Sequence, residues 1–135
     1  MFYQPKKGHP FVIDPYKSLV FPRPIGWISS VSKKGIPNLA PYSFFNAIAV
    51  DPPQVMFSSA APAGSNNYKD SLTNILSTKE FVVNFATLKT RDQMNLSSIE
   101  APNDIDEFIF SKIKKRTSKL VKVPSVAESP VNLEC

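Results

Sequence analysis

The chain has 135 residues, of which 42% are hydrophobic and 20% charged, and its formal net charge is +5. This length fits one domain that buries about two-thirds of the unfolded chain's surface, and thirteen prolines against four glycines favour β structure with rigid connections. The single cysteine, Cys135, excludes an internal disulfide, and no apolar run approaches the roughly 18 residues that span a bilayer, so a cytoplasmic protein that binds no membrane is expected.

Much of the positive charge lies in residues 111–122, SKIKKRTSKLVK, and no aromatic residue interrupts this run. Proteins that bind single-stranded nucleic acid combine basic groups with aromatic side chains on which the bases stack. The run is therefore interpreted as a solvated connector, and no nucleic-acid partner is expected. A basic interaction module is the less favoured alternative.

The first part of the chain is predicted to be irregular. Residues 1–23 are rich in Pro, Lys and aromatic side chains, which is typical of an arm, with one short helical turn over residues 14–19. Strand signals begin at residues 24–32, where the side chains alternate between two faces, and residues 33–35 supply a turn. These segments predict the start of a β-hairpin.

The next segment combines apolar strand signals with chain breakers. Residues 38–50 form an apolar and aromatic run that Asp51-Pro52-Pro53 ends, and Pro41 within it indicates an edge strand or a bulge. Residues 54–59 predict a short strand, and residues 60–67, AAPAGSNN, predict a loop of small residues that leads into a helix.

That helix is predicted over residues 71–78, with Asp70 or Ser71 as its N-cap and with Leu72, Ile75 and Leu76 spaced for one buried apolar face. A half-buried strand over residues 80–86 and a second helix over residues 90–98 follow. The remaining predictions, in chain order, are loop with some helix over 99–119 and extended segments over 119–123 and 131–135.

The start of the predicted helix at residues 71–78 is a candidate phosphate-binding site. Lys69, Asp70 and Ser71 lie where free backbone N–H groups and the positive end of the helix dipole attract anions, and Lys69 adds a full charge. An ordinary capped helix with a surface lysine is the alternative, and it is the favoured one on this segment alone.

Residues 21–59 are interpreted as a barrel wall that holds a ligand, because short polar side chains cluster on the predicted strands. A planar heteroaromatic ring is usually held by such groups over an apolar floor. The polar candidates are Ser29, Ser30, Asn38, Ser43, Asn46, Ser58 and Ser59, and the floor candidates are Ile25, Trp27, Phe44, Phe45 and Met56. The alternative is that these hydroxyls face solvent on an antiparallel sheet.

The sequence lacks the standard catalytic constellations. His9 is the single histidine and lies in the irregular arm, so a histidine-based triad and a structural zinc site are not expected. No GxGxxG or Walker-type loop occurs either. We expect no catalytic residue and no metal ligand, and any chemistry must come from a bound cofactor.

The motifs resemble those of the flavin reductase-like, FMN-binding split-barrel family. Four elements occur in the family's order and spacing: PRPIGWISS, NLAPYSFFN, DPP and KDSLTNI. A further stretch, VAESPVNLEC at residues 126–135, extends the resemblance over roughly residues 19–135. Any one of these motifs alone would be a weak signal, whereas the ordered series is specific.

The resemblance implies a mainly β fold, a six-stranded antiparallel Greek-key split barrel with flanking helices, in one domain over residues 1–135 with residues 1–20 as an N-terminal arm. It further implies a homodimer with one FMN per subunit. Residues on the strands would line the flavin ring and ribityl chain: Trp27, Ser29, Ser30, Asn38, Ser43, Phe44, Phe45, Asn46, Ser58 and Ser59. Lys69, Asp70 and Ser71 would approach the phosphate.

The resemblance also leads to a functional hypothesis, in which hydride passes from NADH or NADPH to the flavin, with an oxygenase as a candidate partner. Family members continue for about 50 to 70 residues beyond SPVNLEC, on the typical span of such a domain. That continuation includes a Gly-Asp-His motif near the flavin and nicotinamide. The chain is therefore expected to lack closing strands of the barrel, and a non-enzymatic FMN-binding or electron-carrier protein is the alternative function.

Overall fold

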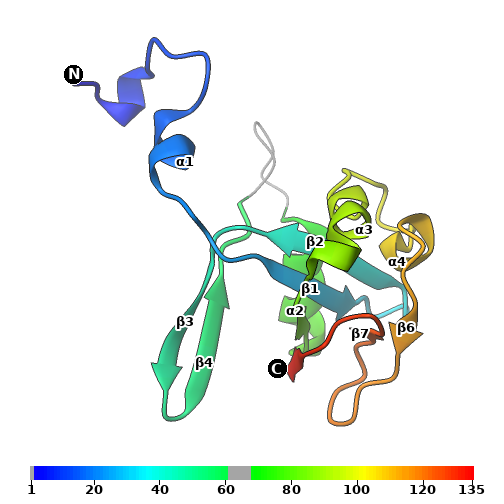
Figure 1. Cartoon of the computed structure of the whole chain (residues 1–135). Helices are drawn as coiled ribbons and strands as arrows, with labels where there is room; N and C mark the ends of the chain where they lie inside the picture. Colours follow the sequence, from blue (N-terminus) through cyan, green and yellow to red (C-terminus); the bar gives the residue numbers. More distant parts are fainter. Residues whose placement is uncertain (1, 61–67) are drawn as a thin grey trace.

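The computed structural model describes residues 2–60 and 68–135 (Figure 1). The predicted loop over residues 60–67 lies almost wholly outside this part of the chain. The described residues contain a four-stranded antiparallel sheet in the order β2-β1-β5-β8. Its strands are β1 (Gly26–Val31), β2 (Pro37–Tyr42), β5 (Val82–Asn84) and β8 (Asn132–Glu134). The fold is mainly antiparallel β structure with flanking helices, as expected. The four-stranded sheet does not close on itself, because β2 and β8 are its edges.

The predicted β-hairpin is confirmed, because β1 pairs with β2 along the whole of both strands. Gly35 has a φ of 81° in the turn, a left-handed conformation that glycine adopts without steric cost. The turn is closed by a hydrogen bond of 2.9 Å from the Gly35 N–H to the Ser32 carbonyl. Pro41 lies in the edge strand β2, where its missing N–H costs no ladder bond, as expected.

The apolar run at residues 38–50 is divided between two strands that belong to different sheets. After β2 the chain turns away at Ser43 and Phe44 and forms a second hairpin, β3 (Phe45–Val50) with β4 (Pro53–Phe57). This hairpin projects away from the four-stranded sheet, and a bulge interrupts its pairing between Ala47 and Ala49 (Figure 1). Because β4 ends at Phe57, Ser58 and Ser59 follow the strand instead of lying within it.

The helices expected at residues 14–19, 71–78 and 90–98 are present with shifts at their ends, as α1 (Pro15–Leu19), α2 (Asp70–Thr78) and α3 (Arg91–Leu96). The helix expected within residues 99–119 is α4 (Glu107–Phe110), and the short helices η1 (Pro5–Lys7) and η2 (Leu88–Thr90) are additional to the prediction. Asp14 caps α1 through its side chain, which accepts a hydrogen bond from the Tyr16 N–H at 2.9 Å. The predicted N-cap of α2 is wrong: the N-cap is Lys69, with no side-chain capping bond.

The predicted buried face of α2 is also corrected. Ser71 and Asn74 are its buried residues, and Leu76 is exposed. The face of α2 toward the sheet is polar, because α2 lies over β1 and β2 and its side chains hydrogen-bond to polar side chains of both strands. Ile75 does pack against the core, as predicted.

The core lies on both faces of β1, because successive strand residues point to opposite sides of a sheet. Trp27 packs with Leu39, Phe108 and Val126 beneath α3 and α4, and Ile28 packs with Val83 and Tyr42 beneath α2 and the β3–β4 hairpin. Strand β5 is covered on both faces, so Val82, Val83 and Asn84 are all buried. The expectation of a half-buried strand there is therefore wrong.

The C-terminal part of the chain matches its predictions unevenly. The segment 131–135 is extended, as predicted, and β8 pairs with β5. The segment 119–123 is not a strand: the Glu134 carboxylate accepts hydrogen bonds from the N–H groups of Lys119 and Leu120 and holds a turn in place. The short strands β6 (Lys115–Arg116) and β7 (Ser125–Val126) pair on either side of it.

Within residues 2–60 and 68–135, none of the helices has both the length and the apolar character needed to cross a membrane.

Gly26 tests the packing between β1 and the base of the β3–β4 hairpin. A Cβ at this position would lie 2.6 Å from Cδ2 of Phe45, well inside van der Waals contact. We expect Gly26→Ala to lower the free energy of unfolding by about 1 to 3 kcal/mol, the usual cost of overpacking, as measured by urea denaturation. The cost should shrink in a Phe45→Leu background, and an equal cost in both backgrounds would contradict this packing.

Candidate functional site

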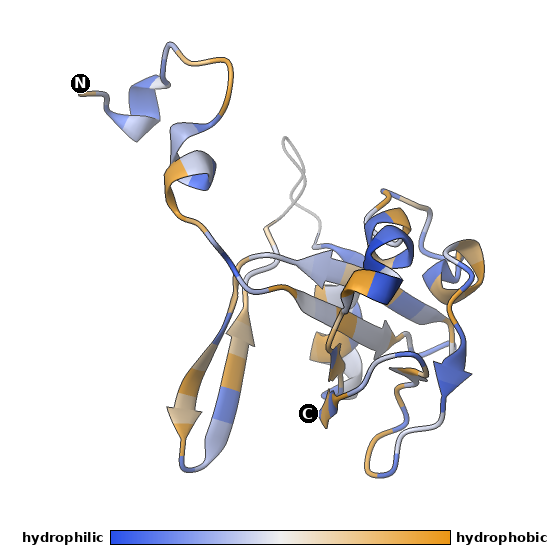
Figure 2. Ribbon diagram, in the orientation of Figure 1, coloured by the Kyte–Doolittle hydropathy of each residue, from blue (hydrophilic) through white to orange (hydrophobic). Residues whose placement is uncertain are grey.

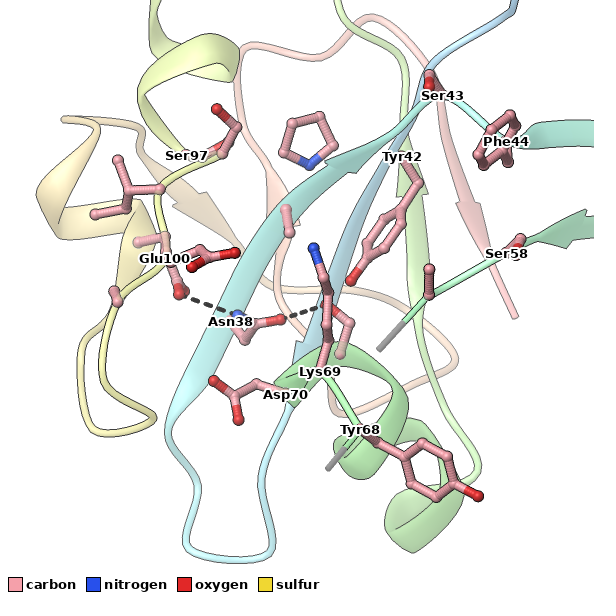
Figure 3. A pocket seen from close by; sticks show the side chains of 18 of the residues that line it. Asn38, Tyr42, Ser43, Phe44, Ser58, Tyr68, Lys69, Asp70, Ser97 and Glu100 are labelled. Atoms are coloured by element: carbon pink, nitrogen blue, oxygen red, sulfur yellow. Dashed lines mark hydrogen bonds between the residues drawn. The ribbon is translucent and has the colours of Figure 1, made fainter. Parts of the chain in front are cut away.

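A cavity of about 580 Å³ opens between the edge strand β2, the start of α2 and the end of α3 (Figure 3). The base of the β3–β4 hairpin forms one wall through Phe44 and Ser58, and the segment after α3 forms another through Ile99 and Glu100. Lys17 of α1 reaches the rim. The cavity therefore joins segments from the first, middle and last thirds of the chain.

Seven of the residues predicted to bind a cofactor line this cavity. They are Asn38, Ser43, Phe44, Ser58, Lys69, Asp70 and Ser71. The strand candidates and the helix-start candidates come from two separate arguments, and the fold brings these members of both groups to one place. Figure 3 shows the Lys69 side chain lying between Asn38 and Tyr42 in the cavity.

Trp27, Ser29 and Ser30 lie elsewhere, fully buried in the central strand β1. The Trp27 Nε1 donates a hydrogen bond of 2.9 Å to the Ser97 hydroxyl, so Trp27 reaches the cavity wall only through Ser97. Ser29 accepts a hydrogen bond from the Asn84 amide at 3.1 Å. These hydroxyls therefore neither line the cavity nor face solvent, because β1 is paired on both edges and covered on both faces.

Three further candidates from the β3–β4 hairpin and its end are also separate from the cavity lining. Phe45 packs against the core beside Ile28, and Asn46 is exposed, with its side-chain carbonyl accepting a bond from the Ala47 N–H at 3.0 Å. The Ser59 hydroxyl is buried without a hydrogen-bond partner among the described residues. The cofactor contacts assigned to these residues stay predictions.

The start of α2 lines the cavity and has backbone N–H groups without partners inside the helix. The first N–H groups of a helix have no intrahelical partner, and the first helical bond here runs from the Thr73 N–H to the Lys69 carbonyl at 3.0 Å. Lys69 is exposed, whereas Ser71 is buried and donates its hydroxyl proton to the Asn38 side chain at 2.6 Å. Ser71 is thus left to accept, and not donate, a hydrogen bond on its cavity side.

The charges around the cavity are mixed. Lys17 and Lys69 face three carboxylates, those of Asp70, Glu100 and Glu107. Burial raises the pKa of Glu107, against hydrogen bonds from the main chain and Asn38 that lower it, and the charge of Asp70 raises it slightly further. Burial also raises the pKa of Asp70. Both carboxyl groups therefore take up a proton more readily than ordinary surface carboxylates do.

Several residues that the sequence argument missed contribute to the site. Tyr42 lines the cavity and packs against Phe57 in a tilted arrangement, with ring centroids 4.8 Å apart. Arg23 holds α1 against the cavity rim: it donates to the Lys17 carbonyl at 2.7 Å and lies over the Phe44 ring at 5.4 Å. A ring contact of Arg23, the arginine of PRPIGWISS, could have been predicted from the sequence, because arginine often stacks on aromatic rings.

No group of three or more His, Cys, Asp or Glu side chains in the described ranges, 2–60 and 68–135, is arranged to hold a metal ion. The cavity offers backbone N–H groups, two lysines, hydroxyls and aromatic rings. This mixture is suited to an organic ligand that carries both an anionic group and a ring.

The fold is that of solved flavin reductase proteins with a split-barrel domain. The chain superposes on nitrilotriacetate monooxygenase component B from Bacillus cereus with a TM-score of 0.83 at 31% identity, covering 95% of this chain and 68% of that one. It superposes on 2-nitrobenzoate 2-nitroreductase NbaA from Pseudomonas fluorescens with a TM-score of 0.76 at 27% identity, covering 94% and 64% of the two chains.

The sequence comparisons agree. The family model for the flavin reductase like domain matches residues 18–135, and the chain therefore belongs to the flavin reductase-like family, as its motifs indicated. An uncharacterized protein of Aquifex aeolicus is 44% identical over 117 residues, which are 87% of this chain and 59% of that protein. The uncharacterized protein YwrF of Bacillus subtilis is 33% identical, covering 90% and 60%. The chain thus spans about three-fifths of these relatives.

Proposed function

We propose that the protein binds FMN in the 580 Å³ cavity and passes hydride from NADH or NADPH to this flavin, as one domain over residues 1–135. One observation carries the proposal: the cavity brings the start of α2 together with Phe44 and the polar side chains of β2. A phosphate and an aromatic ring system can therefore be held in the same space. The family membership supports the choice of a flavin.

The cavity fits FMN in size and in donor chemistry. Sites for cofactors and drug-sized ligands have volumes of about 300 to 1,000 Å³, and this one lies within that range. The free N–H groups at the start of α2, with Lys69 beside them, suit the phosphate. The neighbouring carboxylates of Asp70 and Glu107 oppose an anion, and the charges of Lys17 and Lys69 in the same cavity offset this opposition.

FMN, when bound, supplies a ring that accepts hydride from a nicotinamide. The protein's own residues then have to bind the flavin, orient it toward the nicotinamide and enclose it. Phe44 and Tyr42 offer aromatic surface, and Ser43 and Ser58 offer short polar groups at the same wall. No side chain is assigned as a general acid or base, so the protein's contribution is the placement of the two reactants.

The proposal extends to partners. Exposed apolar side chains on the β3–β4 hairpin, with Ile48 57% and Val50 91% exposed, support a homodimer in which a second copy covers this hairpin (Figure 2). The likeness to a monooxygenase component B supports an oxygenase as the protein that uses the reduced flavin. Size-exclusion chromatography with light scattering would test the homodimer.

The absorbance spectrum and the NAD(P)H oxidation rate test the function together. We expect purified protein supplied with FMN to retain a flavin spectrum after gel filtration and to oxidise NADH or NADPH faster than free FMN alone. A retained spectrum without oxidation would support the carrier alternative and overturn the reductase. A colourless protein that takes up no FMN would contradict both.

Lys69→Ala tests the phosphate end of the proposed site. The substitution removes a charged donor beside the free N–H groups of α2, and we expect FMN affinity to fall by about 1 to 3 kcal/mol, measured by quenching of flavin fluorescence. Lys89→Ala is the matched control, because Lys89 is exposed on η2 and does not line the cavity. Equal affinity in both variants would show that Lys69 is a surface lysine only.

A further inference from the structure

Five buried polar side chains form one hydrogen-bonded group between α4 and α2, which we call the Asn38 network. Its members are Glu107, Asn38, Ser71, Ser30 and Asn74, and each is at most 9% exposed. The Asn38 amide nitrogen donates to the Glu107 carboxylate at 3.0 Å, and the Asn38 amide oxygen accepts from Ser71 at 2.6 Å (Figure 3). The Ser30 hydroxyl also donates to the Asn38 amide oxygen, at 3.3 Å. The Asn74 amide completes the group by donating to the Ser30 hydroxyl at 3.1 Å.

Glu107 determines the direction of every bond in the Asn38 network. An ionised carboxylate can only accept hydrogen bonds, so Asn38 must turn its NH₂ toward Glu107 and its carbonyl toward Ser71. The same carboxylate accepts the outward N–H of Leu39 at 3.1 Å, which would otherwise be unpaired on the edge strand β2. Glu107 therefore fixes both the backbone of β2 and the side chain that holds Ser71.

Ser71 is the second residue of α2, so the Asn38 network ends in the helix turn that lines the cavity. Resting on the proposed function, we propose that Glu107 is a positioning residue for the flavin phosphate, which it aligns through Asn38 and Ser71 by fixing the first turn of α2 on β2. Glu107 would act without donating a hydrogen bond to the phosphate, because its carboxylate is already an acceptor for two donors.

The direction in which FMN affinity changes when Glu107 is replaced by a neutral residue distinguishes this positioning role from simple charge repulsion. Glu107 lines a cavity proposed to hold an anion, and removing a negative charge should by itself tighten the binding of that anion. If Glu107 instead positions the helix start, a neutral replacement should weaken the binding. Glutamine keeps the size of the side chain but presents an NH₂ group to a site that requires two acceptors.

The experiment compares FMN with riboflavin, which lacks the phosphate, on wild type and Glu107→Gln. We expect Glu107→Gln to weaken FMN binding about tenfold and riboflavin binding by less than about twofold. The control is Glu100→Gln, which removes a cavity carboxylate outside the Asn38 network and should tighten FMN binding slightly. A loss of general stability would lower both affinities alike, so the FMN-to-riboflavin ratio is the informative readout.

Two further measurements keep the proposal testable if Glu107→Gln folds poorly. Ser71→Ala breaks the Asn38 network at its other end and should also weaken FMN binding more than riboflavin binding. In the Ser71→Ala background, Glu107→Gln should change FMN affinity by less than about twofold, because the connection from Glu107 to α2 is already broken. Hydrogen exchange at the Thr73 N–H, without any ligand, should be faster in both variants than in wild type.

The outcomes separate the inference from the proposed function. A wild-type protein that binds no FMN would overturn the proposed function, and the inference with it. A wild type that binds FMN, with Glu107→Gln binding it as tightly or more tightly, would overturn the inference alone. Unchanged exchange at Thr73 in both variants would also overturn it.

Discussion

Replacing Asn84 by alanine should lower the free energy of unfolding by about 3 to 5 kcal/mol. Asn84 is fully buried in β5 and makes hydrogen bonds to three other segments. Its amide nitrogen donates to the Trp27 carbonyl at 3.0 Å, and its oxygen accepts from the Val126 N–H at 2.7 Å and the Asn132 amide at 2.6 Å. Alanine would leave these partners unpaired, and each buried unpaired group costs about 1 to 3 kcal/mol.

Urea denaturation followed by circular dichroism measures this cost. Asn103→Ala is the matched control, because Asn103 is exposed in the segment before α4, and we expect it to change stability by less than about 0.5 kcal/mol. A loss below about 1 kcal/mol in Asn84→Ala would contradict the view that Asn84 joins β1, β7 and β8.

Replacing Trp27 by alanine should cost about 3 to 5 kcal/mol, the usual range for emptying a buried aromatic site. Trp27 is 0% exposed, packs with Leu39 and Phe108, and gives its N–H to Ser97. Trp27→Phe keeps most of the packing and loses the hydrogen bond, so its cost should be smaller, about 1 to 2 kcal/mol. Trp27 is the single tryptophan of the chain, so both variants lose the tryptophan fluorescence that would otherwise report unfolding. Circular dichroism is therefore the appropriate probe.

Trp27→Phe also tests the ring contact that the family resemblance implies. Trp27 does not line the cavity and approaches it only through Ser97. We therefore expect the folded variant to bind FMN within about twofold of wild type in a fluorescence titration. A tenfold loss of affinity in protein that is fully folded would show that Trp27 contacts the flavin after all.

Features governed by neighbouring residues could be predicted from the sequence. The β1–β2 hairpin follows from alternation around Gly35, and the α1 turn follows from Asp14 before a proline. The site at the start of α2 could also be predicted, because the helix signal, its preceding lysine and the small-residue loop are adjacent in the chain. Lys69, Asp70 and Ser71 line the cavity for this reason, and four of the ten candidates from the predicted strands line it as well.

Features that depend on distant segments could not be predicted. Ser29 and Ser30 resemble ligand-facing hydroxyls until β5 and α2 bring Asn84 and Asn74 against them from 55 and 44 residues away. Glu107 gives no local signal, because its partners lie 68 and 69 residues earlier on β2. The segment 119–123 has the composition of a strand, but the Glu134 carboxylate binds its N–H groups and no strand pairs with it.

The central claim is that one cavity holds the phosphate and the ring of FMN. Amide chemical shifts in a ¹⁵N–¹H NMR titration with FMN test it most directly, since the chain is 15.0 kDa. We expect saturable shifts at residues 69–71, 43–44 and 97–100, which line the cavity, and none at residues 48–50 on the exposed hairpin. Shifts absent at residues 69–71, or confined to other parts of the chain, would contradict the account.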